Sequence, residues 1–197
     1  MDSRWLAWGH LASASPRRAE LLRQIGVEFE LSPSETAERP HPDEAPADYI
    51  TRIARAKVIG TARKHDAGLV IGADTIVVLD GRLMGKPEDE QAAERMLTQL
   101  SGRWHAVMTG VALYDIETRA EVADYDKTLV KFARLTEREI EWYIATGEPM
   151  DKAGAYGIQG LGGLFVEEIA GNYYNVVGLP IPLVYRLARR LGYSFVK

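Results

Sequence analysis

Five basic residues are candidates for binding a phosphate group. They are Arg17, Arg18, Lys57, Lys86 and Lys152. Arg17 and Arg18 follow Ser15-Pro16, a predicted helix start, although the partial positive charge of a helix N-terminus favours acidic residues there. A polyphosphate would resolve this conflict, because guanidinium groups, ammonium groups and helix N–H groups all bind phosphate oxygens. The alternative is that each cation is an ordinary solvated side chain.

A carboxylate accompanies these cations. Asp74 follows the apolar run LVIGA, which predicts a buried strand that carries Asp74 to the edge of a sheet. Such a carboxylate can hold Mg²⁺ or orient a water molecule, and Glu35 and Glu38 in a polar loop are candidate second ligands. The alternative for Asp74 is a turn residue that hydrogen-bonds its own backbone. The residues alone indicate a small phosphate-rich ligand and phosphoryl hydrolysis or transfer.

Other chemistries find less support in the sequence. His10, His41 and His65 follow no pattern that predicts a metal site, and we interpret His105 as a structural residue of a strand. The serines of ASASP lack a neighbouring His–Asp pattern, and the sequence contains neither a P-loop nor a GxGxxG motif. A covalent serine mechanism is therefore not expected.

Composition narrows the class of protein further. The 197 residues suffice for one domain, and the net charge of −4 argues against nucleic acid or an anionic membrane as a partner. The absence of cysteine excludes disulfides and thiolate zinc sites. No apolar run approaches the roughly 18 residues of a membrane span, so we expect a cytoplasmic protein.

Apolar periodicity and turn residues predict a mixed α/β domain. Strands are expected over residues 6–12, 27–32, 104–114, 121–134 and 164–169. Residues 68–87 are strand-like on both sides of Gly72-Ala73-Asp74, with a hairpin turn at Asp80-Gly81. Helices are expected over 16–25, 47–64, 88–100 and 136–145, followed by a closing helix that ends near 191. The βαβ alternation fails in the middle of the chain, which argues against a Rossmann sheet. The glycine-rich stretch GEPMDKAGAYGIQGLGG is a candidate functional loop.

Five ordered blocks of the sequence resemble the Maf-like nucleoside triphosphate pyrophosphatases, also called septum-formation Maf proteins. The blocks are LASASPRRAELL, IGADTIVVLDGRLMGKP, LSGRWHAVMTGVAL, DKAGAYGIQGLGG and NVVGLPI, and they extend from Leu11 to Ile181. The resemblance implies one domain over residues 1–197, with a mixed sheet, flanking helices and two lobes around a cleft, similar to inosine triphosphate pyrophosphatases. His10 departs from the pattern, because the position before LAS usually holds an apolar residue.

The resemblance also implies an activity and roles for the residues. The activity is hydrolysis of a nucleoside triphosphate to the monophosphate and pyrophosphate with Mg²⁺ or Mn²⁺. Asp74 would be the general base, Lys86 a catalytic cation, and Glu38 (or Glu35, since this loop aligns loosely) a metal ligand together with Asp74. The residues that would bind substrate are Ser13, Arg17, Arg18, Lys57 and Lys152.

Three positions distinguish two branches of the resembled family. Arg17, Thr75 and Gln159 all match the branch that acts on dTTP and UTP, rather than the branch that acts on 7-methyl-GTP. An amide such as Gln159 can both donate to and accept from the edge of uracil or thymine. Two alternatives stay open, a 7-methyl-GTP pyrophosphatase and a non-catalytic nucleotide sensor in septum formation. The resemblance is also compatible with a homodimer.

Overall fold

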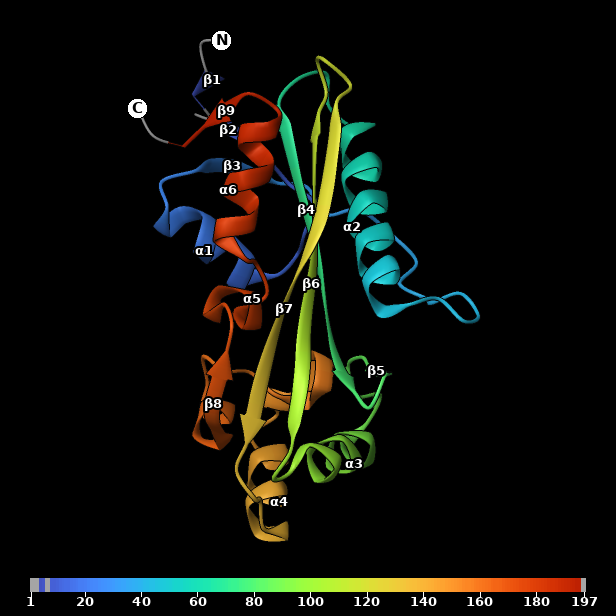
Figure 1. The fold of residues 1–197 in the computed structure, drawn as a ribbon, viewed down its shortest axis with the longest axis vertical. Helices are drawn as coiled ribbons and strands as arrows, with labels where there is room; N and C mark the ends of the chain where they lie inside the picture. The colour runs from blue at the N-terminus through green and yellow to red at the C-terminus, as the bar shows by residue number, and fades with distance from the viewer. Residues whose placement is uncertain (1–3, 6–7, 196–197) are drawn as a thin grey trace. The chain divides into compact units, whose positions relative to one another are not determined.

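The computed structural model describes residues 4–5 and 8–195 and shows an α/β fold (Figure 1). The strands are β1 Arg4–Trp5, β2 Trp8–Leu11, β3 Glu28–Leu31, β4 Leu69–Leu79, β5 Arg82–Met84, β6 Trp104–Asp115, β7 Glu121–Phe132, β8 Val166–Ala170 and β9 Tyr193–Ser194. The α-helices are α1 Pro16–Gln24, α2 Pro46–Ala62, α3 Glu90–Leu100, α4 Glu137–Ala145, α5 Tyr173–Val177 and α6 Ile181–Arg190. Three 3-10 turns are η1 Glu148–Asp151, η2 Ala153–Ala155 and η3 Leu161–Phe165.

The main sheet mixes parallel and antiparallel strands. Its order is β3-β2-β4-β6-β7-β8, and β5 pairs with β4 outside this path. β2 runs parallel to both β3 and β4, whereas β4–β5 and β7–β8 are antiparallel pairs. Hydrogen bonds from Asp115 to Ala120 and from Phe132 to Arg103 close the two ends of the β6–β7 hairpin. The predicted mixed sheet with flanking helices is confirmed.

Local sequence signals explain several of the turns and ends. Asp80 and Gly81 adopt positive φ angles of 49° and 78°, the conformation that a tight hairpin turn requires. Gly26, with φ 74°, ends α1, where Val27 N–H donates to Leu22 and Gly26 N–H donates to Arg23. Pro16 occupies the first turn of α1 as predicted. Ser15 is the N-cap residue of α1, but within the described residues its side chain accepts no capping hydrogen bond from this helix.

Other boundaries differ from the sequence-based expectations. The first predicted strand began at Leu6, but Leu6 and Ala7 lie outside the described residues and β2 begins at Trp8. The short helix α5 was not predicted, and the glycine-rich stretch contains three 3-10 turns in place of an open loop. Among residues 4–5 and 8–195, no helix has both the length and the apolarity that crossing a membrane requires.

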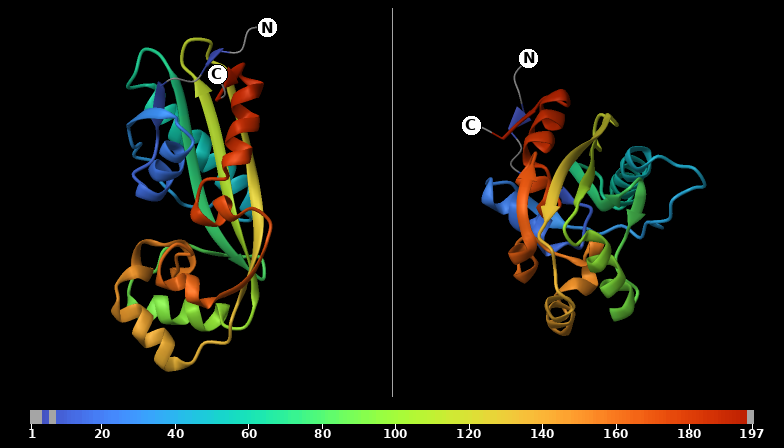
Figure 2. Two further views of the ribbon diagram at one scale, coloured as in Figure 1. Left: turned by 90° about the vertical axis from the view of Figure 1, so that its left-hand side faces the viewer. Right: turned by 60° about the horizontal axis from the view of Figure 1, so that its bottom comes forward.

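The chain divides into two compact units. The first unit comprises residues 1–74, 109–126 and 178–197, and the second comprises residues 75–108 and 127–177. In the first unit, α2 covers one face of the strands and α1 and α6 cover the other (Figures 1 and 2). Buried Ala54, Val58, Val70 and Ala112 pack α2 against β4 and β6.

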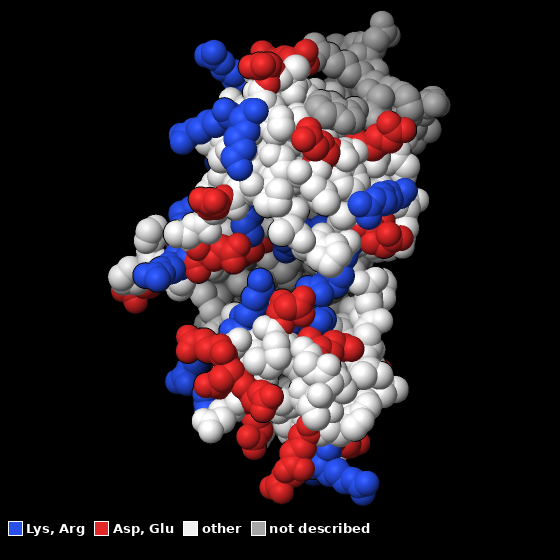
Figure 3. All heavy atoms as spheres, turned by 180° about the vertical axis from the view of Figure 1, so that it is seen from behind, with Lys and Arg blue, Asp and Glu red and all other residues white. Residues whose placement is uncertain are grey.

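The second unit has its own apolar core. Val77, Leu97, Phe132 and Tyr143 are buried in it, and they come from β4, α3, β7 and α4. The predicted cleft between two lobes stays a prediction. On the face that Figure 3 draws, acidic and basic side chains are interspersed, as the small net charge of −4 suggests.

Candidate active site

Asp74 is held in the first unit at the end of a buried run of β4. Residues 69–73 of this strand are buried, and the Asp74 side chain is only 10% exposed. Its Oδ1 atom lies 2.8 Å from Nζ of Lys57. A carboxylate buried in this way needs a positive partner, because an isolated buried charge is strongly disfavoured. Lys57 supplies that charge.

Lys57 joins two carboxylates. Its side chain, 9% exposed, extends from the buried face of α2, and Nζ lies 2.7 Å from Oε1 of Glu38 as well as 2.8 Å from Asp74. The same Nζ lies 3.4 Å from the Ala73 carbonyl oxygen. The structure thus brings Asp74 and Glu38 together at one cation. Glu38, rather than Glu35, is the loop acid that contacts Lys57.

Two glycines allow α2 to approach the sheet this closely. A Cβ atom on Gly72 would lie 2.7 Å from the Val58 side chain and 3.0 Å from the Ala54 carbonyl oxygen. A Cβ atom on Gly110 of β6 would collide with the carbonyl of Ile50. Because both positions lack a side chain, the α2 backbone rests directly on β4 and β6. This contact sets the distance between Lys57 and Asp74.

A clamp of charged residues anchors the loop that carries Glu38. Arg52 of α2 donates to Oε1 and Oε2 of Glu44 at 2.6 Å each, and also donates to the Arg39 carbonyl at 3.0 Å. This bidentate pair lowers the pKa of Glu44 to about 2, chiefly through the hydrogen bond from Arg52. Arg55, which is also on α2, pairs with Glu121 at 3.2 Å. Arg52 therefore positions Glu38 through the loop.

Arg18 is pinned inside the first unit. Its Nε donates to the Gly178 carbonyl at 2.8 Å and its Nη1 donates to Ser13 Oγ at 3.1 Å. Burial lowers the pKa of Arg18, and the negative charges of Asp74 and Glu38 oppose that shift. The alternative of an ordinary solvated side chain is therefore excluded for Arg18. Arg17 is half-buried, and its positive charge also acts on Arg18.

Tyr49 is a neighbour of the acids that sequence reasoning missed. It is buried on α2, eight residues before Lys57 and so on the same helix face. Burial raises the pKa of Tyr49 to about 12, and the charges of Asp74 and Glu38 add to the shift. The helical spacing from Tyr49 through Ile53 to Lys57 was the signal that could have identified it.

Four predicted site residues belong to the second unit. Thr75 directly follows Asp74 in β4, and Lys86 and Gln159 are exposed. A backbone hydrogen bond of 3.0 Å from Gly154 to the Gly85 carbonyl joins the loop of Lys86 to the loop of Lys152. The structure thus brings these two cation-bearing loops together within the second unit. The convergence of the residues of the two units on one ligand stays a prediction.

A second clamp holds the turn that carries Gln159. Oε2 of Glu148 accepts from Leu161 N–H at 2.9 Å, and Oε1 accepts from Gly162 N–H at 3.1 Å and from the Tyr143 hydroxyl at 2.8 Å. The hydroxyl of Tyr143 also accepts from Gly157 N–H at 3.2 Å. Both ends of the Gly157–Gly162 turn are therefore fixed by α4 and η1. The sequence contains no periodic signal for this arrangement.

Comparison with known proteins assigns the chain to a family. The model of the Maf family, described as Maf-like protein, matches residues 10–191. The chain belongs to the Maf family. A Maf relative in Geobacter sulfurreducens named dTTP/UTP pyrophosphatase is 53% identical over 182 residues, which cover 92% of this chain and 95% of the relative. Another of that name in Symbiobacterium thermophilum is 47% identical over 183 residues, 93% of each chain.

A solved structure of lower similarity also matches this Maf chain. The Ham1 protein of Staphylococcus aureus is 15% identical, with a TM-score of 0.45, and the match covers 75% of this chain and 85% of that protein. The resemblance to a Maf family predicted from the ordered sequence blocks is confirmed by the family match.

Proposed function

We propose that this Maf protein hydrolyses dTTP and UTP to the nucleoside monophosphate and pyrophosphate. The observation that carries the proposal is the cluster of Asp74, Lys57 and Glu38, with a buried carboxylate 2.8 Å from an ammonium group. The names of the two relatives at 53% and 47% identity support the same reaction and the same substrates. Arg17, Thr75 and Gln159, which match the dTTP/UTP branch, support the choice of pyrimidine. The proposed place of action is the cytoplasm.

Asp74 acts as the general base in this proposal. Its carboxylate takes a proton from a water molecule whose oxygen attacks the α-phosphorus, and the bond from that phosphorus to the bridging oxygen breaks. Pyrophosphate leaves with the electron pair of that bond. Lys57 orients the Asp74 carboxylate through its 2.8 Å contact, and Arg18 adds positive charge beside the phosphates. Lys86 and Lys152 of the second unit hold the departing pyrophosphate.

Asp74 and Glu38 would hold the divalent cation. Their carboxylates already share one positive charge, the Lys57 ammonium, so this pair of oxygen donors suits a cation. Hard carboxylate oxygens select Mg²⁺ or Mn²⁺, which usually bind through one or two carboxylates and the substrate phosphates. When bound, such an ion neutralises phosphate charge and polarises the phosphoryl oxygens.

The first experiment measures pyrophosphate release. Wild-type protein is assayed with dTTP, UTP, CTP and 7-methyl-GTP in Mg²⁺ or Mn²⁺. The variant Asp74→Asn is assayed in the same way, because its amide oxygen can still accept a hydrogen bond from Lys57. We expect dTTP and UTP to be the best substrates, and Asp74→Asn to lower kcat about 100-fold or more while it still binds nucleotide. Near-normal turnover by Asp74→Asn would overturn the role of this residue. Nucleotide binding without any pyrophosphate release by the wild type would instead identify a sensor.

A second experiment separates the two loop acids. Glu38→Gln should raise the Mg²⁺ concentration needed for half-maximal turnover by about tenfold or more, the scale expected when a metal site loses an important group. Glu35→Gln in the same loop is the matched control and should keep the wild-type Mg²⁺ dependence. Equal Mg²⁺ dependence of the two variants would remove Glu38 from the metal site.

A further inference from the structure

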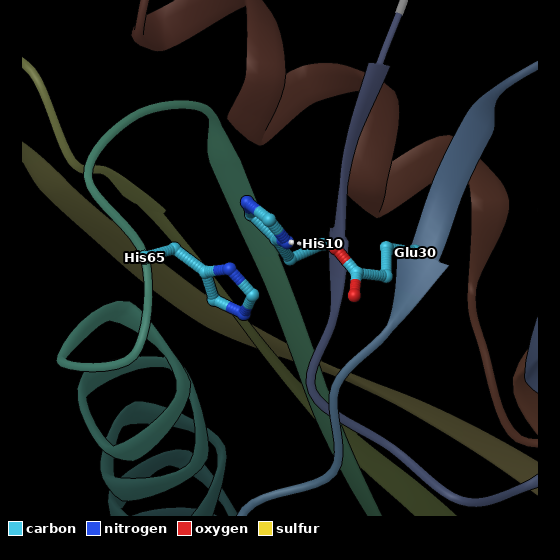
Figure 4. A group of neighbouring side chains, drawn as sticks. All are labelled: His10, Glu30 and His65. Carbon is cyan, nitrogen blue, oxygen red and sulfur yellow. Dashed lines mark ion pairs between the residues drawn. The ribbon is translucent and has the colours of Figure 1, made fainter.

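A cluster of His10, Glu30 and His65 takes no part in the proposed reaction (Figure 4). Each side chain offers a ligand atom, and these atoms all lie within 4.8 Å of one another. The three residues come from β2, from β3 and from the connection between α2 and β4, so they are distant in the sequence. They all belong to the first unit. The sequence had given no reason to group the histidines, and the fold brings two of them into contact.

The fold places these residues together through a strand register and a ring contact. β2 and β3 are parallel, and His10 is the residue opposite Glu30 in their register. Nδ1 of His10 lies 3.6 Å from Oε2 of Glu30, the contact dashed in Figure 4. The His65 ring stacks on the His10 ring at a centroid distance of 3.6 Å. The cluster is therefore built from the sheet and one helix end.

The Nε2 atom of each histidine has an oxygen partner, as the second ring nitrogen of a metal-binding histidine usually has. Nε2 of His10 donates to the Ala67 carbonyl at 3.1 Å, since a carbonyl can only accept, and this bond orients Nδ1 toward Glu30. Nε2 of His65 lies 2.9 Å from Ser32 Oγ, which directs Nδ1 of His65 back to the cluster. A metal-binding histidine usually bonds an oxygen through its second ring nitrogen, which fixes the ring and its tautomer.

We propose that His10, Glu30 and His65 form a binding site for a divalent transition-metal ion, of which Zn²⁺ is the probe. Two imidazole nitrogens and one carboxylate oxygen suit Zn²⁺, with water as the fourth ligand, whereas Mg²⁺ requires oxygen ligands. His10 is 1% exposed while the Glu30 side chain is 56% exposed, so the ion enters from the side of Glu30. The site differs in donor chemistry from the oxygen-only pair of Asp74 and Glu38.

Binding requires one defined rearrangement. A metal ion lies in the ring plane of each histidine that binds it, at about 2.0–2.1 Å from the nitrogen. The two rings are inclined by 27° and stacked, so their nitrogens do not yet aim at one point. His65 is half-buried and is the ring that turns, because His10 is enclosed and held by Ala67. The bound ion would then join β2, β3 and the α2–β4 connection.

The test uses metal-free full-length protein titrated with Zn²⁺ by calorimetry in excess Mg²⁺, which occupies oxygen-only sites. Wild-type protein should bind one Zn²⁺ at this site, and Zn²⁺ should raise its melting temperature. His65→Ala and Glu30→Gln should each weaken binding by about tenfold or more. His41→Ala, which removes an exposed histidine elsewhere, is the matched control and should bind as the wild type does.

Two results would overturn the proposal. One is wild-type protein that binds no Zn²⁺ in excess Mg²⁺, and the other is His65→Ala with the Zn²⁺ affinity and Zn²⁺-dependent melting temperature of the wild type. Co²⁺ gives an independent readout, since its visible spectrum in wild-type protein should show nitrogen ligation that His65→Ala loses. Mg²⁺-supported pyrophosphate release is measured in the same samples. Its presence or absence tests the proposed function separately, because none of the three residues belongs to that site.

Discussion

The Nζ atom of Lys57 contacts two carboxylates and one carbonyl, so this residue holds the two candidate acids of the first unit together. Its removal would leave Asp74 buried without its cation, a change that costs about 3–5 kcal/mol in comparable pairs. Helical spacing predicted that Lys57 lies on α2, and the apolar run of β4 predicted that Asp74 ends a buried stretch. The contact between them was not predictable, because it depends on the glycines that let α2 approach the sheet.

His105 gives the second unit a pH dependence. It is 3% exposed, its Nε2 lies 2.8 Å from the Tyr156 hydroxyl, and burial lowers the pKa of His105 from 6.5 to about 4. The unfolded chain therefore binds more protons than the folded chain between pH 6.5 and about 4, so stability falls as pH falls through this window. We expect His105 to account for about 2 kcal/mol of lost stability between about pH 7.5 and about pH 5.

Urea unfolding at these two pH values measures this contribution. His105→Gln, which keeps a hydrogen-bonding group beside Tyr156, should lose less stability on acidification than the wild type. His41→Gln, at an exposed histidine, should lose as much as the wild type does. If His105→Gln and wild-type protein show the same difference between the two pH values, His105 is not the group responsible.

At the scale of elements, the turn from Gly157 to Gly162 is held by side chains of α4 and η1. A Cβ atom on Gly160 would collide with the Glu148 carboxylate, and one on Gly162 would lie 2.5 Å from the Tyr143 hydroxyl. Glycine is required here for close approach, and no apolar period specifies the turn. For this reason the sequence indicated a functional loop but could not predict the three 3-10 turns or the clamp that fixes them.

Glu148→Gln should loosen the turn that carries Gln159. The NH₂ group of the new amide would face one backbone N–H, so one hydrogen bond would be lost. A buried N–H without its acceptor costs about 1–3 kcal/mol of stability. If the turn positions Gln159 against the base, KM for UTP should rise about tenfold while kcat changes little. Glu141→Gln, at an exposed acid of α4, is the control and should keep the wild-type KM. An unchanged KM for Glu148→Gln would show that the clamp serves stability alone.

At the scale of the whole molecule, the proposed site draws on both units. Lys86 lies in the second unit, so its effect on catalysis tests whether the two units act on one triphosphate. Lys86→Ala should lower kcat/KM by at least about tenfold, as expected for loss of a charge-assisted hydrogen bond, with little change in melting temperature. Arg95→Ala, at an exposed cation of α3, should behave as the wild type does. Full activity of Lys86→Ala would remove Lys86 from the proposed site.

The sequence predicted the fold class and most helices and strands, because periodicity and turn residues are local signals. These local signals did not predict the division into two units, for which only the family resemblance, with its two lobes, gave an expectation, because β4, β6 and β7 each contribute residues to both units. A long strand carries the same alternation along its whole length, so nothing in LVIGADTIVVL indicates that the unit boundary falls between Asp74 and Thr75.

That division means that neither unit corresponds to an uninterrupted stretch of the gene. The polypeptide passes from one unit to the other after residues 74, 108, 126 and 177. A truncation at any of these positions would split a unit rather than release it, and exchange of one unit between relatives would need several simultaneous junctions. Recombination that exchanges one unit alone is therefore disfavoured, whereas an insertion at the exposed residues 117–119 would fall within a single segment of the first unit.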